Sequence, residues 1–278
     1  LKELPQCTAI AFWGYGEPLM HPEIVDMVNL AHKAGIQTEI ITNGHLLDKD
    51  ISKVLIQAGL DTLVVSVDGT TPASYGNVRL GGNLSKVEEN IRQMNKLREN
   101  STTGKLSLGL EFVIMKSNIA RLPDLADHAH SMKADFVILT NLLPCTEDMQ
   151  DEILYWISAT VNDDAEHPKM SNELMLPRMD LRTDCLNPLK TLLKRMDKPM
   201  PDNMAFQQEY CCPFIEKGSA AIAWTGDVSP CIALMHSYRC YILGREKLIK
   251  KYSVGNIGQE KINDIWNKRN YQFFRNRV

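Results

Sequence analysis

The sequence predicts an α/β fold, a partial βα barrel followed by a small cysteine-containing C-terminal module. In the first half of the 278 residues, short apolar runs alternate with amphipathic helical stretches. This alternation is typical of a parallel sheet with right-handed crossovers. The unusual polar residues follow the expected strands, which is where βα barrels carry their chemistry. From Cys211 onward the sequence changes character.

The expected strands are short runs rich in apolar residues. They cover 8–13, 37–41, 63–67, 106–115 and 136–139. Between them, apolar residues recur at helical spacing, as in the stretch 84–97. Asp48 is expected to cap one of the helices, and Gly59 is expected to end it.

The sequence suggests three regions: a core at 1–144, a connector at 145–208 and a C-terminal module at 209–278. In the connector we expect helices at 148–161 and 186–196 between breaker-rich stretches. In the module, 220–224 and the residues from Val228 onward are typical of a hairpin, and 262–274 of a final helix.

Composition excludes several classes of partner. The formal charge is 31 − 34 = −3, which gives no electrostatic footprint for nucleic acid or an anionic membrane. No apolar run is long enough to span a bilayer, and no signal-peptide pattern is present. Seven irregularly spaced cysteines argue against a secreted disulfide framework. We therefore expect a cytoplasmic protein, and the missing initiator Met predicts that the chain begins mid-protein.

The first candidate motif directly follows the first expected strand and reads Gly14-Tyr15-Gly16-Glu17-Pro18. Two glycines let the backbone approach a ligand or take positive φ. The carboxylate of Glu17 can accept hydrogen bonds from an ammonium group. The alternative is a plain turn with an exposed glutamate, since short motifs are often coincidental.

Two further polar motifs end the second and third expected strands. Thr42-Asn43-Gly44 suits a turn whose side chains bond outward. Ser66 and Asp68 are two residues apart on a strand and so point to the same side, where they can bond the two hydroxyls of a ribose. Taken singly, an ordinary turn and a carboxylate that caps the next turn are the simpler interpretations.

Taken together, the three motifs resemble the radical SAM superfamily, whose members use S-adenosylmethionine (SAM). They occur in order, about 25 residues apart, each at the end of a strand. The resemblance implies a partial (β/α)6, TIM-like barrel whose first βα unit is missing here. It implies that Gly14–Pro18 take the SAM amino group, that Thr42 and Asn43 continue the site, and that Ser66 and Asp68 bind ribose. Asn118, after the fourth strand, is a weaker match to a polar SAM contact, with a helix N-cap as the alternative.

The main departure from this family concerns its catalytic cluster. Members ligate a [4Fe–4S] cluster with a Cys-x3-Cys-x2-Cys motif, which does not occur in this chain. Cys7 stands alone, and we expect it to be a buried strand thiol. The chain is either truncated or a non-catalytic homologue, and its other features favour truncation. The sequenced chain alone is therefore expected to be inactive.

A second resemblance concerns the C-terminal module. Cys212 is followed after 13 residues by Gly226, and Gly226 after four residues by Cys231. This spacing resembles the opening of the SPASM domain and implies that Cys212 and Cys231 ligate an auxiliary iron–sulfur cluster. The alternative is two unrelated buried cysteines. Cys145, Cys185 and Cys240 are interpreted as incidental.

The resemblances imply a radical SAM enzyme that reductively cleaves SAM to a 5′-deoxyadenosyl radical. The stretch 211–278 most resembles maturases of tungsten-cofactor oxidoreductases. The substrate is thus expected to be a cofactor precursor, a peptide or a protein, and the electron donor a ferredoxin or flavodoxin. A cluster-less, peptide-recognising protein is the alternative from another class. A phosphate-binding aldolase fits less well, because no strand-end Schiff-base lysine or late phosphate loop is evident.

Overall fold

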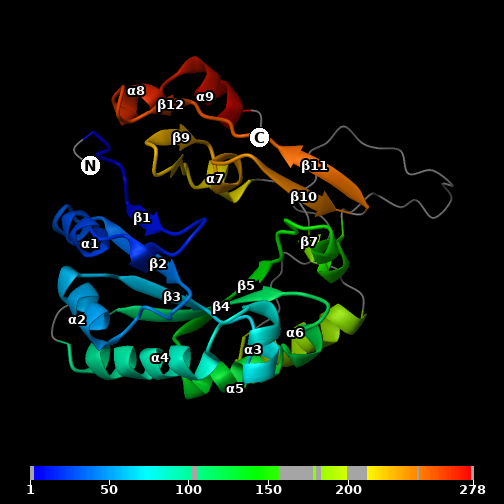
Figure 1. Cartoon of the computed structure of the whole chain (residues 1–278). Helices are drawn as coiled ribbons and strands as arrows, with labels where there is room; N and C mark the ends of the chain where they lie inside the picture. The colour runs from blue at the N-terminus through cyan, green and yellow to red at the C-terminus, as the bar shows by residue number, and fades with distance from the viewer. Residues whose placement is uncertain are drawn as a thin grey trace, which may run out of the picture. The chain divides into compact units, whose positions relative to one another are not determined.

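A computed structural model describes residues 3–101, 106–156, 178–179, 183–198, 212–242 and 244–276 (Figure 1). The chain divides into two compact units. The first contains Pro5–Thr140 together with Asn187–Lys198, and the second contains Asn141–Leu186 and Pro199–Val278.

The first unit is built on a five-stranded sheet in the order β1-β2-β3-β4-β5. The strands are β1 (Ala9–Phe12), β2 (Gln37–Thr42), β3 (Thr62–Ser66), β4 (Ser107–Ile114) and β5 (Phe136–Asn141). The pairs β1–β2, β2–β3 and β3–β4 are all parallel. The α/β fold expected from the sequence is therefore confirmed, and the carboxyl ends of neighbouring strands meet at one edge of the sheet.

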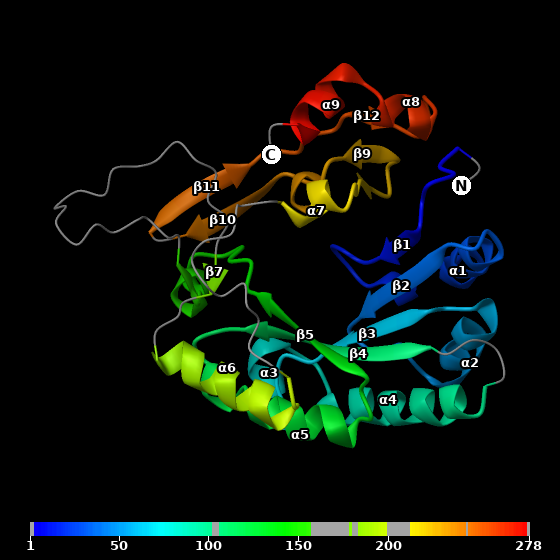
Figure 2. The same cartoon turned by 180° about the vertical axis from the view of Figure 1, so that it is seen from behind.

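Helices cover one face of this sheet (Figure 2). They are α1 (Ile24–Lys33), α2 (Lys49–Ala58), α3 (Pro72–Val78), α4 (Leu84–Glu99), α5 (Asp124–Ser131) and α6 (Thr183–Arg195). Their apolar sides form the main core with alternate strand residues, such as Leu63 and Val65 of β3 and Leu108 and Leu110 of β4. Because side chains alternate along a strand, the residues between these point to the other face.

Most of the expected elements are present with ends shifted by one to three residues. Asp48 caps α2 through its side chain, and Gly59 ends it with φ of 84°. The helix α3 was not expected, because its short sequence has no apolar stripe. Thr71 and Ser74 start it with reciprocal capping bonds. Cys7 is half-buried and precedes β1, so the expectation of a buried strand thiol was wrong.

The second unit is made of short elements. Its strands include β8 (Ala221–Ile222), β9 (Asp227–Ser229) and β12 (Gly255–Asn256) in one antiparallel sheet, and the hairpin β10 (Tyr238–Ile242) with β11 (Arg245–Ile249). The expected hairpin around Gly226 is thus confirmed. Two small strands, β6 (Tyr155–Trp156) and β7 (Arg178–Met179), also pair.

Two helix predictions for the second unit need correction. The stretch 148–161 begins as the 3-10 helix η3 (Asp148–Glu152) and then enters β6, while 157–161 lie outside the described residues. The stretch 262–274 forms two short helices, α8 (Ile262–Trp266) and α9 (Arg269–Arg275). Ile265 and Tyr271 from these helices are fully buried against Val228 and Val254.

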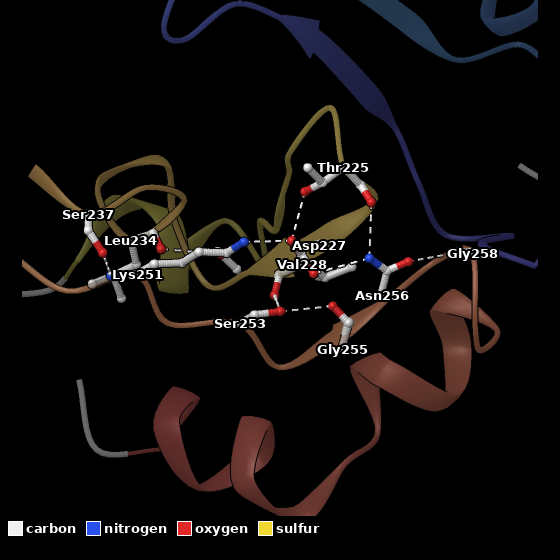
Figure 3. Close-up of polar contacts among 11 residues, drawn as sticks. Thr225, Asp227, Val228, Leu234, Ser237, Lys251, Ser253, Gly255, Asn256 and Gly258 are labelled. Carbon is white, nitrogen blue, oxygen red and sulfur yellow. Dashed lines mark hydrogen bonds and ion pairs between the residues drawn. The ribbon is translucent and has the colours of Figure 1, made fainter.

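A carboxylate-centred network joins β9 to β12 (Figure 3). Asp227 Oδ2 accepts hydrogen bonds from Thr225 Oγ1 at 2.7 Å and from Lys251 Nζ at 2.5 Å. Asp227 Oδ1 accepts one from Asn256 Nδ2 at 3.1 Å. The Lys251 ammonium, followed by the Thr225 and Asn256 bonds, holds the pKa of Asp227 well below its usual range. The network fixes the turn between β8 and β9 and ties it to β12.

No helix among the described residues is both long and apolar enough to cross a membrane.

We expect Gly69→Ala to destabilise the first unit. A Cβ atom at Gly69 would overlap the backbone nitrogen of Tyr75, which cannot move without disturbing α3. Overpacking of this kind costs about 1–3 kcal/mol in the free energy of unfolding. The control is Gly76→Ala inside α3, where a Cβ meets nothing within 4 Å. Urea unfolding should separate the two variants, and equal stability would contradict the prediction.

We expect Asp227→Asn to lower the thermal unfolding midpoint of the second unit at neutral pH, because it removes the Lys251 ion pair. The pKa of Asp227 is lower in the folded protein than in the unfolded chain. The ionised carboxylate therefore stabilises the fold fully at pH values above its unfolded pKa of about 4, and progressively less as the pH falls below that value. The difference between wild type and variant should shrink accordingly in a pH series of melts. The exposed Asp264→Asn variant is the control, and a difference that grows on acidification would refute the assignment.

Candidate functional site

The glycine-rich turn after β1 needs glycine for its backbone conformation. Gly14 has φ of 141° and Gly16 has φ of 101°, values that other residues rarely adopt. Nothing lies within 4 Å of a Cβ atom placed at Gly16, so crowding is not the reason for glycine there. Tyr15, between them, is half-exposed. The turn thus presents its backbone at the carboxyl end of β1.

Glu17 ties this turn to the end of β2. Its Oε1 atom accepts hydrogen bonds from Thr42 Oγ1 at 2.7 Å and from Leu19 N at 3.0 Å, at the start of the 3-10 helix η1 (Pro18–Met20). Its Oε2 atom accepts one from Asn43 N at 2.8 Å. The structure therefore joins the first two sequence motifs by direct bonds. Because a carboxylate has about four acceptor positions, Glu17 can accept one more hydrogen bond.

A hollow of about 250 Å³ lies beside the glycine-rich turn. Its lining comes from the end of β1, the turn and α1, and includes Trp13, Gly14, Tyr15, Glu17, His21 and Met27. Ser66, Asp68 and Asn118 are not among the lining residues.

Ser66 and Asp68 are both buried, at 6% and 4% exposure, and both already have partners. Ser66 Oγ donates to Glu111 Oε2 at 2.6 Å. Asp68 Oδ2 accepts from Arg79 Nε at 2.8 Å, and Asp68 Oδ1 accepts from Val113 N at 3.1 Å. Sequence reasoning missed Arg79 and Glu111, because neither is part of a motif and both meet their partners only through the fold.

Asn118 precedes the 3-10 helix η2 (Ile119–Arg121) but makes no side-chain cap bond there. Its Oδ1 accepts from Met115 N at 2.8 Å, and its Nδ2 donates to Val113 O at 2.9 Å. The side chain therefore fastens the turn after β4, with both ends of the amide bonded to backbone.

Cys212 and Cys231 lie on either side of the β8–β9 hairpin. Cys212 precedes α7 (Pro213–Glu216), and Cys231 precedes the 3-10 helix η5 (Ile232–Leu234). Both are half-buried free thiols. Burial raises the pKa of the Cys231 thiol, and Cys212 adds a smaller upward contribution, so the two groups are near enough to interact. Cys211 lies outside the described residues.

A second pair of cysteines was not anticipated. Tyr241 N donates to Pro144 O at 2.9 Å, which brings the neighbouring residues Cys145 and Cys240 together. Burial raises the pKa of Cys240, with a smaller upward contribution from Cys145. Sequence spacing carries no signal for this pair. In the part of the chain that the structure describes, no three His, Cys, Asp or Glu side chains are arranged to hold a metal ion.

Comparison with known proteins accounts for both regions. Residues 1–112 match the radical SAM superfamily, and residues 211–278 match SPASM, an iron–sulfur cluster-binding domain. The chain is 33% identical over 279 residues to the tungsten-containing aldehyde ferredoxin oxidoreductase cofactor-modifying protein of Pyrococcus furiosus, covering 99% of this chain and 71% of the relative. It is 29% identical to the PqqA peptide cyclase of Gluconobacter oxydans over 43% of this chain and 32% of the relative.

Solved structures with the same fold include SuiB of Streptococcus suis bound to SAM, with a TM-score of 0.59 and 14% identity. That match covers 99% of this chain and 58% of SuiB. The AdoMet-bound enzyme anSMEcpe gives a TM-score of 0.60 at 17% identity, covering 98% of this chain and 71% of that one. At these identities the likeness shows the fold alone.

The two matched families imply the cofactors expected from the sequence, SAM and [4Fe–4S] clusters. The predicted resemblance is confirmed by the Pyrococcus relative, whose similarity extends through both regions. The chain belongs to the radical SAM superfamily, in the group of enzymes that carry a SPASM domain.

Proposed function

We propose that the protein is a SAM-dependent maturase acting on a cofactor of a tungsten-containing oxidoreductase or on its precursor. The observation that carries the proposal is the 33% identity to a cofactor-modifying protein, sustained over 99% of the chain. Because the chain spans 71% of that relative and 58% of SuiB, the activity of the whole protein is part of the proposal.

The residues of the first unit fit SAM. The turn at Gly14 and Gly16 exposes backbone, and Glu17 keeps an acceptor position for an ammonium group beside the bonds to Thr42 and Asn43. When SAM is bound and reduced by one electron, it supplies a 5′-deoxyadenosyl radical for hydrogen abstraction. Glu17 would hold the amino group, and the rigid link from Glu17 to β2 would fix its direction.

The cysteines of this chain suit the auxiliary iron–sulfur cluster but not the primary one. The seven cysteines contain no Cys-x3-Cys-x2-Cys motif, so no residue of this chain is assigned to the primary cluster. Cys212 and Cys231 suit two ligand positions of an auxiliary cluster, because they flank the β8–β9 hairpin in the SPASM region and their thiols interact electrostatically. SAM reduction also needs an electron source, for which we propose a low-potential ferredoxin or flavodoxin.

A peptide is the second candidate substrate. The PqqA peptide cyclase is similar over 43% of the chain, so peptide modification is represented among the relatives. Assays with a tungsten-cofactor precursor and with a precursor peptide would separate the two substrates. A protein that binds SAM but modifies neither would support the non-catalytic alternative.

We expect Glu17→Gln to weaken SAM binding by about 10- to 100-fold, because a hydrogen bond to a charged group contributes about 1.5–3 kcal/mol. The measurement is equilibrium dialysis with labelled SAM on the full-length protein after anaerobic cluster reconstitution. Glu23→Gln, at an exposed carboxylate with no side-chain cap bond, is the matched control. A folded Glu17→Gln protein with wild-type affinity would contradict the assignment.

We expect the double variant Cys212→Ala, Cys231→Ala to lose about four iron atoms per chain, the content of one [4Fe–4S] cluster. Iron is quantified in the reconstituted full-length protein, with Cys7→Ala as the control that keeps its iron. An unchanged iron content would rule out ligation by the pair. Loss of iron with SAM cleavage retained would place this cluster outside the primary redox step.

A further inference from the structure

Glu111 lies in β4, directly opposite Ser66 of β3. It pairs in register with Ser66 across β3 and β4, and its Oε2 atom accepts the Ser66 hydroxyl at 2.6 Å. A hydroxyl bonded to an ionised carboxylate at this distance is a strong, charge-assisted hydrogen bond. The bond fixes the orientation of both side chains.

Both side chains point away from the helices. Leu110 precedes Glu111 and Val65 precedes Ser66, and both of these apolar residues pack in the helix-covered core. Because strand side chains alternate, Ser66 and Glu111 face the opposite side of the sheet. Figure 2 shows that the helices of the first unit leave that side uncovered.

Glu111 has one carboxylate oxygen that accepts no hydrogen bond among the described residues, whereas each oxygen of Asp68 already accepts one. Both oxygens of Asp68 are engaged, by the Arg79 guanidinium and by Val113 N, and the residue is 4% exposed. Glu111 is half-buried, and among the described residues its Oε1 atom accepts no hydrogen bond. Because Glu111 is more exposed than Asp68 and has an unengaged oxygen, it is the more accessible carboxylate for a ligand hydroxyl.

The spacing also suits SAM. Glu17 bonds to Asn43 N, just past Thr42, and Thr42 pairs with Val65 in the next strand. Ser66 thus lies one strand away from the Glu17 contact, and Glu111 lies two strands away. Since neighbouring strands are about 4.8 Å apart, the span is about 10 Å, which suits a ligand with an amino group at one end and a ribose further along.

We propose that Glu111, oriented by Ser66, binds the ribose hydroxyls of SAM, and that Asp68 is a positioning residue. Glu111 Oε1 accepts a hydrogen bond from a hydroxyl of the ribose, and Ser66 holds the other carboxylate oxygen. Asp68 and Arg79 then support β4 from the end of β3 through Val113. This inference rests on the proposed function, because it names the ribose contact of the same SAM site.

The experiment compares the binding of S-adenosylhomocysteine and of its 2′-deoxy and 3′-deoxy analogues by calorimetry. It uses the full-length protein with its clusters intact. We expect wild type to prefer the ribose form over at least one deoxy analogue, and Glu111→Gln to bind it about tenfold or more weakly and to lose that preference. Asp68→Asn should keep the preference. Glu17→Gln should weaken all three ligands by the same factor.

The outcomes separate this inference from the function it rests on. If wild type binds none of the ligands, the proposed SAM site itself fails. If wild type binds them but does not distinguish them, or if Asp68→Asn loses the preference while Glu111→Gln keeps it, the assignment to Glu111 is overturned. Thermal melts identify any misfolded variant, and Glu111→Asp, which keeps the charge but shortens the reach, then serves in its place with the same expected loss of preference.

Discussion

The carboxylate of Glu17 is the contact on which the organisation of the sheet edge depends. It accepts hydrogen bonds from Thr42 and Asn43, so the loop after β1 cannot move independently of β2. Thr42 Oγ1 also accepts from Gly44 N, and Gly44 O accepts from the buried Asn90 of α4. A continuous set of hydrogen bonds therefore runs from the glycine-rich turn into the helical layer. It holds the loop in one geometry without relying on the apolar core.

The regular part of the first unit could be predicted from the sequence because its signals are local. Strand-length apolar runs, the cap at Asp48 and the left-handed Gly59 each act within a few residues. The short helix α3 also begins at a local signal, the Thr71–Ser74 capping box, but it has no apolar stripe, and so it was not expected. The stretch 148–161 has helical composition but turns into a strand at Tyr155, so tertiary pairing prevails over local preference there.

The candidate site likewise combines residues that have a local sequence signal with residues that have none. Motif residues such as Glu17 and Ser66 could be identified from spacing, but their partners could not. Glu111 meets Ser66 only because β3 and β4 pair in that register, and Arg79 reaches Asp68 only after the chain has passed through α3. For the same reason, Cys145 and Cys240 come together with no warning in the sequence. A motif thus identifies one residue of a contact, and its partner becomes known only from the folded structure.

The first unit is formed from two separate stretches of the chain, and this has a consequence for its biosynthesis. The unit includes Asn187–Lys198, and within it Leu189 and Leu192 of α6 are buried while Arg195 donates to Pro123 O beside α5. On the ribosome, therefore, the sheet and its first five helices would emerge well before this last covering segment is made. Co-translational folding of the unit can be complete only after residue 198 has left the exit tunnel. Until then the surface that Leu189 and Leu192 pack against stays uncovered.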